Sequence, residues 1–310
     1  MAKLWRFDIL IDDAFMHFNP DRTIIRPDEN KSLLSVVNGF EDGHWMKKNF
    51  QDFIFNNVAL TALTADERAK IIDEQYTTLT EAARHLRLID DKGKGSEIAE
   101  IVLYGIMKHH FGALSVVPKI FYKQNDSDNA KGADSVHIVI DKDGEFQLWL
   151  GEAKFYSDIE DDRLYEPLKS VAQMLSTPIL KKEIGVMTSL NELDDQIEDK
   201  ALAAQIKDAL SGGKSMDDIK PRIHVPILLL HQCDITAGAT MLDDDYKNTI
   251  ISHHEERAVS FFKKQINKLG GIANYEKIQF HLILFPIPNK KEIVDWFMDR
   301  AQKLKEDANG

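Results

Sequence analysis

Cysteine, long apolar runs and basic residues are all scarce in this chain, and each scarcity excludes a class of protein. Cys233 is the single cysteine among 310 residues, so no intrachain disulfide can form, which fits a reducing compartment. No apolar run approaches the roughly 20 residues that a membrane-spanning helix requires. Asp8, Asp12 and Asp13 interrupt the N-terminal segment, which is therefore unlike a signal peptide. We expect a cytoplasmic protein that does not act in a membrane.

Basic residues are outnumbered: 39 Lys and Arg against 51 Asp and Glu give a formal net charge of −12. Proteins that bind nucleic acid avidly on their own usually carry a basic face, so this balance argues against such binding. A local cluster departs from the mean, with Lys92, Lys94, Lys119, Lys123 and Lys131 close together in the sequence. A weak intrinsic affinity would also suit an enzyme that a partner holds on DNA.

The most informative stretch, residues 132–154, predicts a β-hairpin. Residues 134–140 are rich in β-branched types and residues 146–150 in apolar and aromatic types, as in strands. Between them, residues 141–145 read Asp-Lys-Asp-Gly-Glu, a strong turn signal. An aspartate begins the first strand, and a Glu-x-Lys sequence ends the second.

The length of the turn decides which residues face each other. A three-residue loop that ends at Gly144 pairs residues whose numbers sum to 286, and it sets Asp134 directly opposite Glu152. A two-residue loop of Asp143 and Gly144 is the alternative. It pairs Asp134 with Ala153 and places the two carboxylates on opposite faces of the hairpin.

Asp134, Glu152 and Lys154 together outline a site for phosphodiester hydrolysis. Two opposed carboxylates repel each other unless a cation lies between them or one is protonated. Oxygen ligands of this kind suit Mg²⁺ or Mn²⁺. Lys154 shares the face of Glu152, where it would orient or deprotonate a water and stabilise charge on a phosphate. The alternative is a surface hairpin with an ordinary Glu–Lys pair.

The same residues resemble those of a known enzyme superfamily. Asp134 followed by Glu152-x-Lys154 on a hairpin is similar to the motif of PD-(D/E)xK nucleases. More narrowly, the strings KGADSVHI (131–138) and LWLGEAKFY (148–156) resemble the HamA family, the nuclease subunits of Hachiman anti-phage defence systems. The resemblance covers roughly residues 93–190.

This resemblance implies a metal-dependent DNA nuclease that uses Mg²⁺ or Mn²⁺. Asp134, Glu152 and the carbonyl of Ala153 would bind the ion. A glutamate of the preceding helix would assist, with Glu97 the better match and Glu100 the second choice; a Glu97 that serves only the helix dipole is the alternative. The resemblance also implies a helicase partner that delivers DNA and restrains cleavage. An inactive nuclease-fold scaffold subunit and a nuclease that acts on RNA are the rival functions.

The wider pattern predicts an α/β protein with a restriction-endonuclease-like αβββαβ core. A helix over 97–111, capped by Ser96, precedes a strand over 114–122, the hairpin and a helix over 163–175. A short strand over 184–188 is expected to complete the core. In the superfamily, polar residues of the helix after the hairpin often contact the DNA backbone.

On the predicted helix over 163–175, Lys169 and Gln173 are four residues apart and share one face. The resemblance makes them candidates for contacts with the DNA backbone. Ordinary surface residues are the alternative.

A polar, glycine-containing segment at 90–95 marks the expected domain boundary. Residues 1–92 would form an N-terminal α/β region, mostly helical, which is a candidate partner-binding region. Residues 93–310 would form the nuclease-like domain. Beyond the core it would add strands over 223–231 and 278–285 and helices over 191–210, 246–269 and 293–304.

Cys233 and two groups of histidines carry no recognisable catalytic pattern. His231 shares a strand face with Cys233, but packing is the expected role of both residues. His253 and His254 are expected to lie exposed on a helix.

Overall fold

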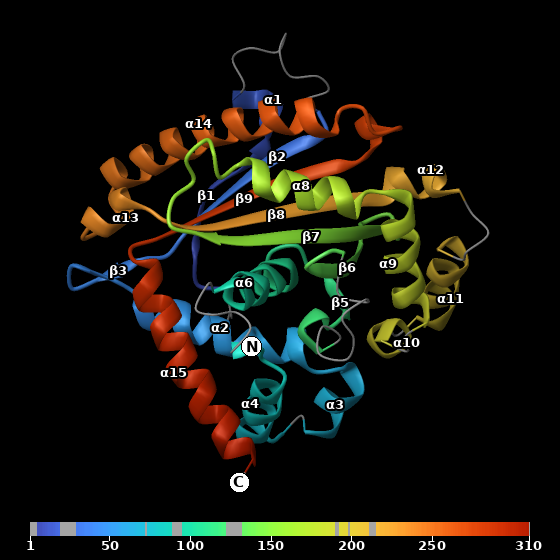
Figure 1. Cartoon of the computed structure of the whole chain (residues 1–310), viewed down its shortest axis with the longest axis horizontal. Coiled ribbons are helices and arrows are strands. Elements are labelled where there is room, and N and C mark those ends of the chain that lie inside the picture. The colour runs from blue at the N-terminus through green and yellow to red at the C-terminus, as the bar shows by residue number, and fades with distance from the viewer. Residues whose placement is uncertain are drawn as a thin grey trace.

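Seven strands from the beginning, middle and end of the chain form one mixed sheet in the computed structural model (Figure 1). They are β1 (Asp8–Ala14), β2 (Lys31–Val37), β5 (Leu114–Val117), β6 (Ser135–Ile140), β7 (Phe146–Tyr156), β8 (Ile223–Gln232) and β9 (Gln279–Ile287). Their order across the sheet is β1-β2-β9-β8-β7-β6-β5. A separate short hairpin joins β3 (Phe40–Glu41) and β4 (His44–Trp45). The structure describes residues 5–18, 29–71, 73–88, 95–121, 132–189, 192–197, 199–210 and 215–309.

Parallel pairing in the middle of the sheet explains its nearly continuous apolar sequences. Strands β2, β9, β8 and β7 run parallel, and such strands are usually covered on both faces. In β8, Ile227 and Leu229 pack into one apolar layer, whereas Leu228 and Leu230 pack into the other. The sheet therefore lies between two layers of helices (Figure 1).

The helices of one layer are α8 (Tyr165–Met174), α9 (Thr177–Ser189), α11 (Lys200–Ala209) and α14 (Asp244–Leu269). Those of the other are α2 (Lys47–Ala62), α4 (Gln75–Arg84), α6 (Ser96–His109) and α15 (Lys290–Asn309). Shorter helices are α1 (Phe15–Phe18), α3 (Ala65–Lys70), α10 (Glu192–Gln196), α12 (Met216–Ile219) and α13 (Asp234–Gly238). Across the described part of the chain, no helix combines the length and apolarity needed to cross a membrane.

The hairpin of β6 and β7 has the register that the longer loop predicts. Its paired residues have numbers that sum to 286, beginning with Ser135 and Gly151. Gly144 has a φ of 78°, in the left-handed region that glycine adopts without steric cost. The N–H of Gly144 donates to the carbonyl oxygen of Asp141 at 3.1 Å, which closes the turn. The three-residue loop is therefore confirmed.

The regular ladder of this hairpin stops one residue short of Asp134. The N–H of Asp134 donates to the carbonyl oxygen of Gly151 at 2.8 Å, where a continued ladder would pair Asp134 with Glu152. Strand β7 continues to Tyr156 beside β8. Asp134 thus lies at the end of the ladder rather than inside it, and the Asp134–Glu152 backbone pair does not form.

The order α6, β5, β6, β7 and α8 confirms the first five elements of the expected αβββαβ core. The pairs β5–β6 and β6–β7 are antiparallel, and β8 joins β7 in parallel. The strand expected over 184–188 is wrong, because these residues belong to α9. Leu180, Ile184 and Met187 are all buried, and their spacing is that of one helix face. Strand β8 supplies the last strand of the core instead.

The N-terminal region contributes directly to the main sheet. Strand β1 pairs with β2, and β2 pairs with β9, so the two N-terminal strands share a sheet with the C-terminal ones. The expected domain boundary falls in residues 89–94, which lie outside the described residues. The division of the chain between residues 92 and 93 stays a prediction.

Candidate active site

A cleft of about 470 Å³ opens where the β6–β7 ladder ends beside α8. The segment before β6 supplies Asp134, and β7 supplies Glu152 and Lys154. Helix α8 adds the polar residues Ser170 and Gln173. Gly132 and Met174 complete the lining. The cleft therefore brings together three of the residues that the sequence predicts for the site.

Asp134 and Glu152 interact strongly although they are not a backbone pair. Asp134 Oδ2 accepts a hydrogen bond from the N–H of Ala153 at 3.1 Å, which holds its carboxylate against β7. Glu152 is 2% exposed. Burial, and next the negative charge of Asp134, raise the pKa of Glu152 to about 7. The two carboxylates therefore share the cleft at a cost in charge repulsion.

Lys154 offsets part of that repulsion. Its Nζ lies 2.5 Å from Oε1 of Glu152, and its side chain is 24% exposed at the mouth of the cleft. Burial lowers the pKa of Lys154, but the charges of Glu152 and Asp134 outweigh burial, so the net pKa is raised. Lys154 is accordingly an ammonium ion at neutral pH, positioned between a carboxylate and solvent.

Glu97 is placed elsewhere. It lies in the first turn of α6 and is 1% exposed. Its Oε1 accepts a hydrogen bond from the backbone N–H of Arg87 at 2.8 Å and lies 3.8 Å from Arg87 Nε. Glu100, the second choice, is also buried. Neither glutamate is among the described residues that line the cleft with Asp134 and Glu152.

The sequence of the chain can be compared with known families. A family model described as HamA matches residues 12–301, most of the chain. The chain belongs to the HamA family. Membership of this family indicates a component of the Hachiman defence system. The match extends well beyond residues 93–190 and includes strands β2 and β9 and helix α14. No curated protein sequence matches the chain.

Two glycines of the HamA-like strings are explained by close contacts around the cleft. A Cβ atom on Gly132 would lie 1.8 Å from Oε1 of Glu183. A Cβ atom on Gly151 would lie 2.2 Å from Oγ of Ser135 and 2.8 Å from a methyl carbon of Leu103 on α6. A side chain at either position would force these neighbouring side chains to move, which glycine avoids.

Glu183 is a residue of this region that sequence reasoning missed. Its Oε1 accepts a hydrogen bond from the N–H of Ala133 at 3.2 Å, and its Oε2 lies 2.6 Å from Nζ of Lys119. Both charged side chains are buried. The ion pair therefore holds the segment that leads into Asp134. Helical spacing places Glu183 on the buried face of α9 with Leu180. This spacing is missed because a strand is expected over 184–188.

The basic cluster expected before the hairpin is only partly visible. Lys119 is buried in its ion pair and is not a surface cation, contrary to expectation. Lys92, Lys94, Lys123 and Lys131 lie outside the described residues.

Helix α8 presents different polar residues to the cleft from those expected. Gln173 lines the cleft, whereas Lys169 is exposed and is not among the lining residues that the structure describes. Ser170, which the sequence analysis did not select, lines the cleft and hydrogen-bonds Glu152. Its spacing of three from Gln173 puts both side chains on one helix face.

The donor atoms of the cleft fit a hard divalent cation. Asp134 and Glu152 offer carboxylate oxygens, and the carbonyl of Ala153 leaves β7 on the same edge as the N–H that binds Asp134. Such oxygen donors suit Mg²⁺ and Mn²⁺. A buried carboxylate whose pKa is raised by a like charge is also the group that a nearby cation would stabilise most.

Proposed function

We propose that this HamA-family chain is the nuclease effector of its defence system and hydrolyses DNA with the help of Mg²⁺. The observation that supports it best is the convergence of Asp134, Glu152 and Lys154 in one cleft, on a hairpin of the expected register. This arrangement resembles the PD-(D/E)xK motif and supports the proposal. Glu97 is not among the described residues that line this cleft, and its role in assisting the metal stays a prediction.

Asp134, Glu152 and the Ala153 carbonyl would hold Mg²⁺, with Mn²⁺ as a substitute. When bound, the ion would polarise a phosphate oxygen, neutralise developing charge and lower the pKa of a water. Asp134 stays fixed for this task by its hydrogen bond to Ala153. Glu152 is oriented by Lys154 and Ser170. Both carboxylates are thus positioned before any ligand arrives.

Lys154 lies beside the carboxylates that would bind the ion. In the metal-free protein the charges of Glu152 and Asp134 raise its pKa, so it carries a proton there at neutral pH. We assign it to donating a hydrogen bond to the water or to a phosphate oxygen and to stabilising negative charge there. In the reaction, the oxygen of water bonds to phosphorus, the bond to one sugar oxygen breaks, and that oxygen gains a proton.

The charge of the chain supports a partner that supplies the DNA. A net charge of −12 disfavours tight binding to a phosphate backbone, which depends on Lys and Arg contacts. We propose that a helicase subunit of the same system presents DNA at the cleft and restrains cleavage until it is required. The nuclease then needs little affinity of its own for DNA.

The test is cleavage by the purified chain with and without the helicase subunit, in Mg²⁺ or in a chelator. Supercoiled, linear and single-stranded DNA and RNA would be compared. Glu152→Gln and Lys154→Ala should each reduce cleavage by about 10²-fold or more. Glu145→Gln and Lys142→Ala are matched controls because they change exposed residues in the turn of the same hairpin, and both should cut normally.

Three results would contradict parts of the proposal. Undiminished cleavage by Glu152→Gln would reject the site. A wild-type complex that binds DNA and RNA but cuts neither would favour the scaffold role. Faster cleavage of RNA than of any DNA would favour the ribonuclease role.

A further inference from the structure

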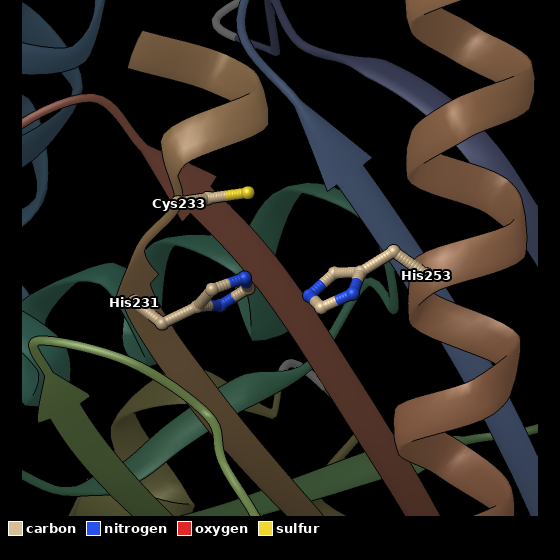
Figure 2. Close-up of side chains that lie close together, drawn as sticks. All are labelled: His231, Cys233 and His253. Carbon is tan, nitrogen blue, oxygen red and sulfur yellow. The ribbon is translucent and has the colours of Figure 1, made fainter.

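Three side chains with nitrogen or sulfur donors meet at the carboxyl end of β8, outside the cleft. His231 lies in β8, Cys233 follows the strand, and His253 projects from α14 (Figure 2). The donor atoms of these three residues all lie within 4.8 Å of one another. Figure 2 shows the two imidazole rings turned toward each other, with the sulfur beside them.

His231 offers a lone pair toward this cluster. It is 0% exposed, and its Nδ1 lies 3.1 Å from the carbonyl oxygen of Leu229. A carbonyl only accepts, so Nδ1 carries the proton and Nε2 presents a lone pair. Nε2 has no hydrogen-bond partner among the described residues. Histidines that bind metals commonly have this arrangement, with one ring nitrogen held by a carbonyl and the other on the ion.

The surroundings of the cluster favour a defined geometry rather than a loose contact. Cys233 is 7% exposed and belongs to a small apolar cluster with Val37, Tyr246 and Ile250. His254 packs its ring against that of His231, at 5.5 Å between centroids. His253 is half-buried, so it is the most exposed of the three residues.

The expectation that His254 lies exposed on its helix is wrong. His254 is fully buried, not exposed, and its Nδ1 lies 2.7 Å from Oγ of Ser35 on β2. Buried aromatic and polar contacts therefore fix α14 against the sheet on both sides of His253. A ligand side chain on such a helix is held in place by its neighbours.

We propose that His231, Cys233 and His253 form a Zn²⁺ site with three protein ligands and a fourth position open to solvent. Imidazole nitrogen and cysteine sulfur are the donors that Zn²⁺ prefers, and tetrahedral bonding needs donors about 3.5 Å apart. The donor atoms lie within 4.8 Å of one another, so small side-chain rotations would bring them to this spacing. This inference is independent of the proposed nuclease function.

Such an ion would fasten α14 to β8 near the cleft. His231 is the register partner of Tyr156, two residues after Lys154 on β7. Helix α14 also holds the loop after β7, because Ser260 Oγ donates to Asp161 at 2.6 Å and Lys264 Nζ lies 3.1 Å from the same carboxylate. The site would thus be a structural clamp on the layer that carries α8.

The test is zinc binding by the full chain, measured by competition with a chromophoric chelator. A Glu152→Gln background removes binding at the cleft carboxylates. One Zn²⁺ per chain is expected. Cys233→Ser and His253→Gln should each weaken binding by at least about tenfold, and His44→Gln, at an exposed histidine, should not. With Co²⁺, the wild type should show a thiolate charge-transfer band that Cys233→Ser lacks.

Folding of the variants can be checked separately, because serine is nearly isosteric with cysteine and His253 is half-buried. Without metal, their melting temperatures should match the parent. Added Zn²⁺ should raise the melting temperature of the parent alone. The proposal is overturned if the parent binds no zinc, or if His253→Gln binds it as tightly as the parent does.

Discussion

Asp134 Oδ2 lies 3.1 Å from the backbone nitrogen of Ala153 and accepts its hydrogen bond. The Asp134 side chain thus supplies a hydrogen bond to β7 just beyond Ser135 and Gly151, the last backbone pair of the β6–β7 ladder. The same carboxylate raises the pKa of Glu152. Asp134 therefore has a structural and an electrostatic role, and substitutions can separate them.

Asp134→Asn should separate these roles from each other. Asparagine keeps an oxygen that can accept from Ala153, but it removes the negative charge beside Glu152. In metal-free buffer this variant should be at least as stable as the wild type, because a like-charge repulsion is lost. Asp134→Ala should be less stable than Asp134→Asn by about 1–2 kcal/mol. Both should lose about 10²-fold in cleavage. Equal melting temperatures for the two variants would show that the hydrogen bond contributes nothing.

Binding of Mg²⁺ should release a proton below pH 7. Burial and the charge of Asp134 raise the pKa of Glu152 to about 7 from its ordinary value of 4.5. In metal-free protein, protonated Glu152 contributes stability that is fully present below pH 4.5 and is lost as pH rises through about 7. A cation needs the ionised form, so its affinity should rise up to about pH 8 and then level off. Calorimetry in two buffers of different ionisation enthalpy measures the released proton, and buffer-independent heats at pH 6 would contradict the prediction.

Gly132→Ala should destabilise the protein by about 1–3 kcal/mol, because the new Cβ would overlap the Glu183 carboxylate. Gly185→Ala is a matched control in α9, where nothing lies within 4 Å of the added Cβ. That control should stabilise the helix by up to about 1 kcal/mol. Denaturant unfolding of both variants measures the contrast, and a neutral Gly132→Ala would mean that Glu183 moves without cost.

Half-buried histidines of β8 and β9 should make the protein sensitive to mild acid. Burial lowers the pKa of His224 to about 4, and its Nδ1 lies 2.9 Å from Nε2 of His281 in a stack with Trp149. In the unfolded chain a histidine titrates near its ordinary value of 6.5. The unfolded state therefore binds more protons as pH falls from 6.5 to 4, and stability is lost by up to about 1.4 kcal/mol per pH unit for each such histidine. Unfolding midpoints at pH 7.5, 6 and 5 should fall less steeply in His224→Gln; a parallel decline would exclude His224 as a cause.

The hairpin could be predicted from the sequence because its determinants are local. Gly144 fixes the turn, the turn fixes the register, and the register brings Glu152 and Lys154 toward Asp134. The register alone does not fix the position of the Asp134 side chain, because the chain leaves the ladder before Asp134. The Asp134 carboxylate reaches the strand of Glu152 through its hydrogen bond with the N–H of Ala153. The alternation of residues along strands does not predict this bond.

Other features depend on contacts between distant segments and could not be predicted in the same way. The short apolar run at 184–188 fits a strand or a buried helix, and tertiary packing in α9 decides between them. Glu183 contacts Lys119 across 64 residues of sequence. The cluster at His231 depends on the packing of α14 on the parallel sheet, which brings His253 close to His231 and Cys233. The placement of Glu97 likewise depends on Arg87, which belongs to the preceding segment.

Beyond Gly151, one edge of β7 runs on without a strand beside it among the described residues. Side chains meet its backbone instead: Asp134 accepts from the N–H of Ala153, and Lys290 Nζ donates to the carbonyl of Phe155 at 2.6 Å. A cation on the Ala153 carbonyl would extend this replacement of a missing strand. Metal binding would then also satisfy a backbone group at the open edge of the sheet. It should slow hydrogen exchange at the amide of Ala153.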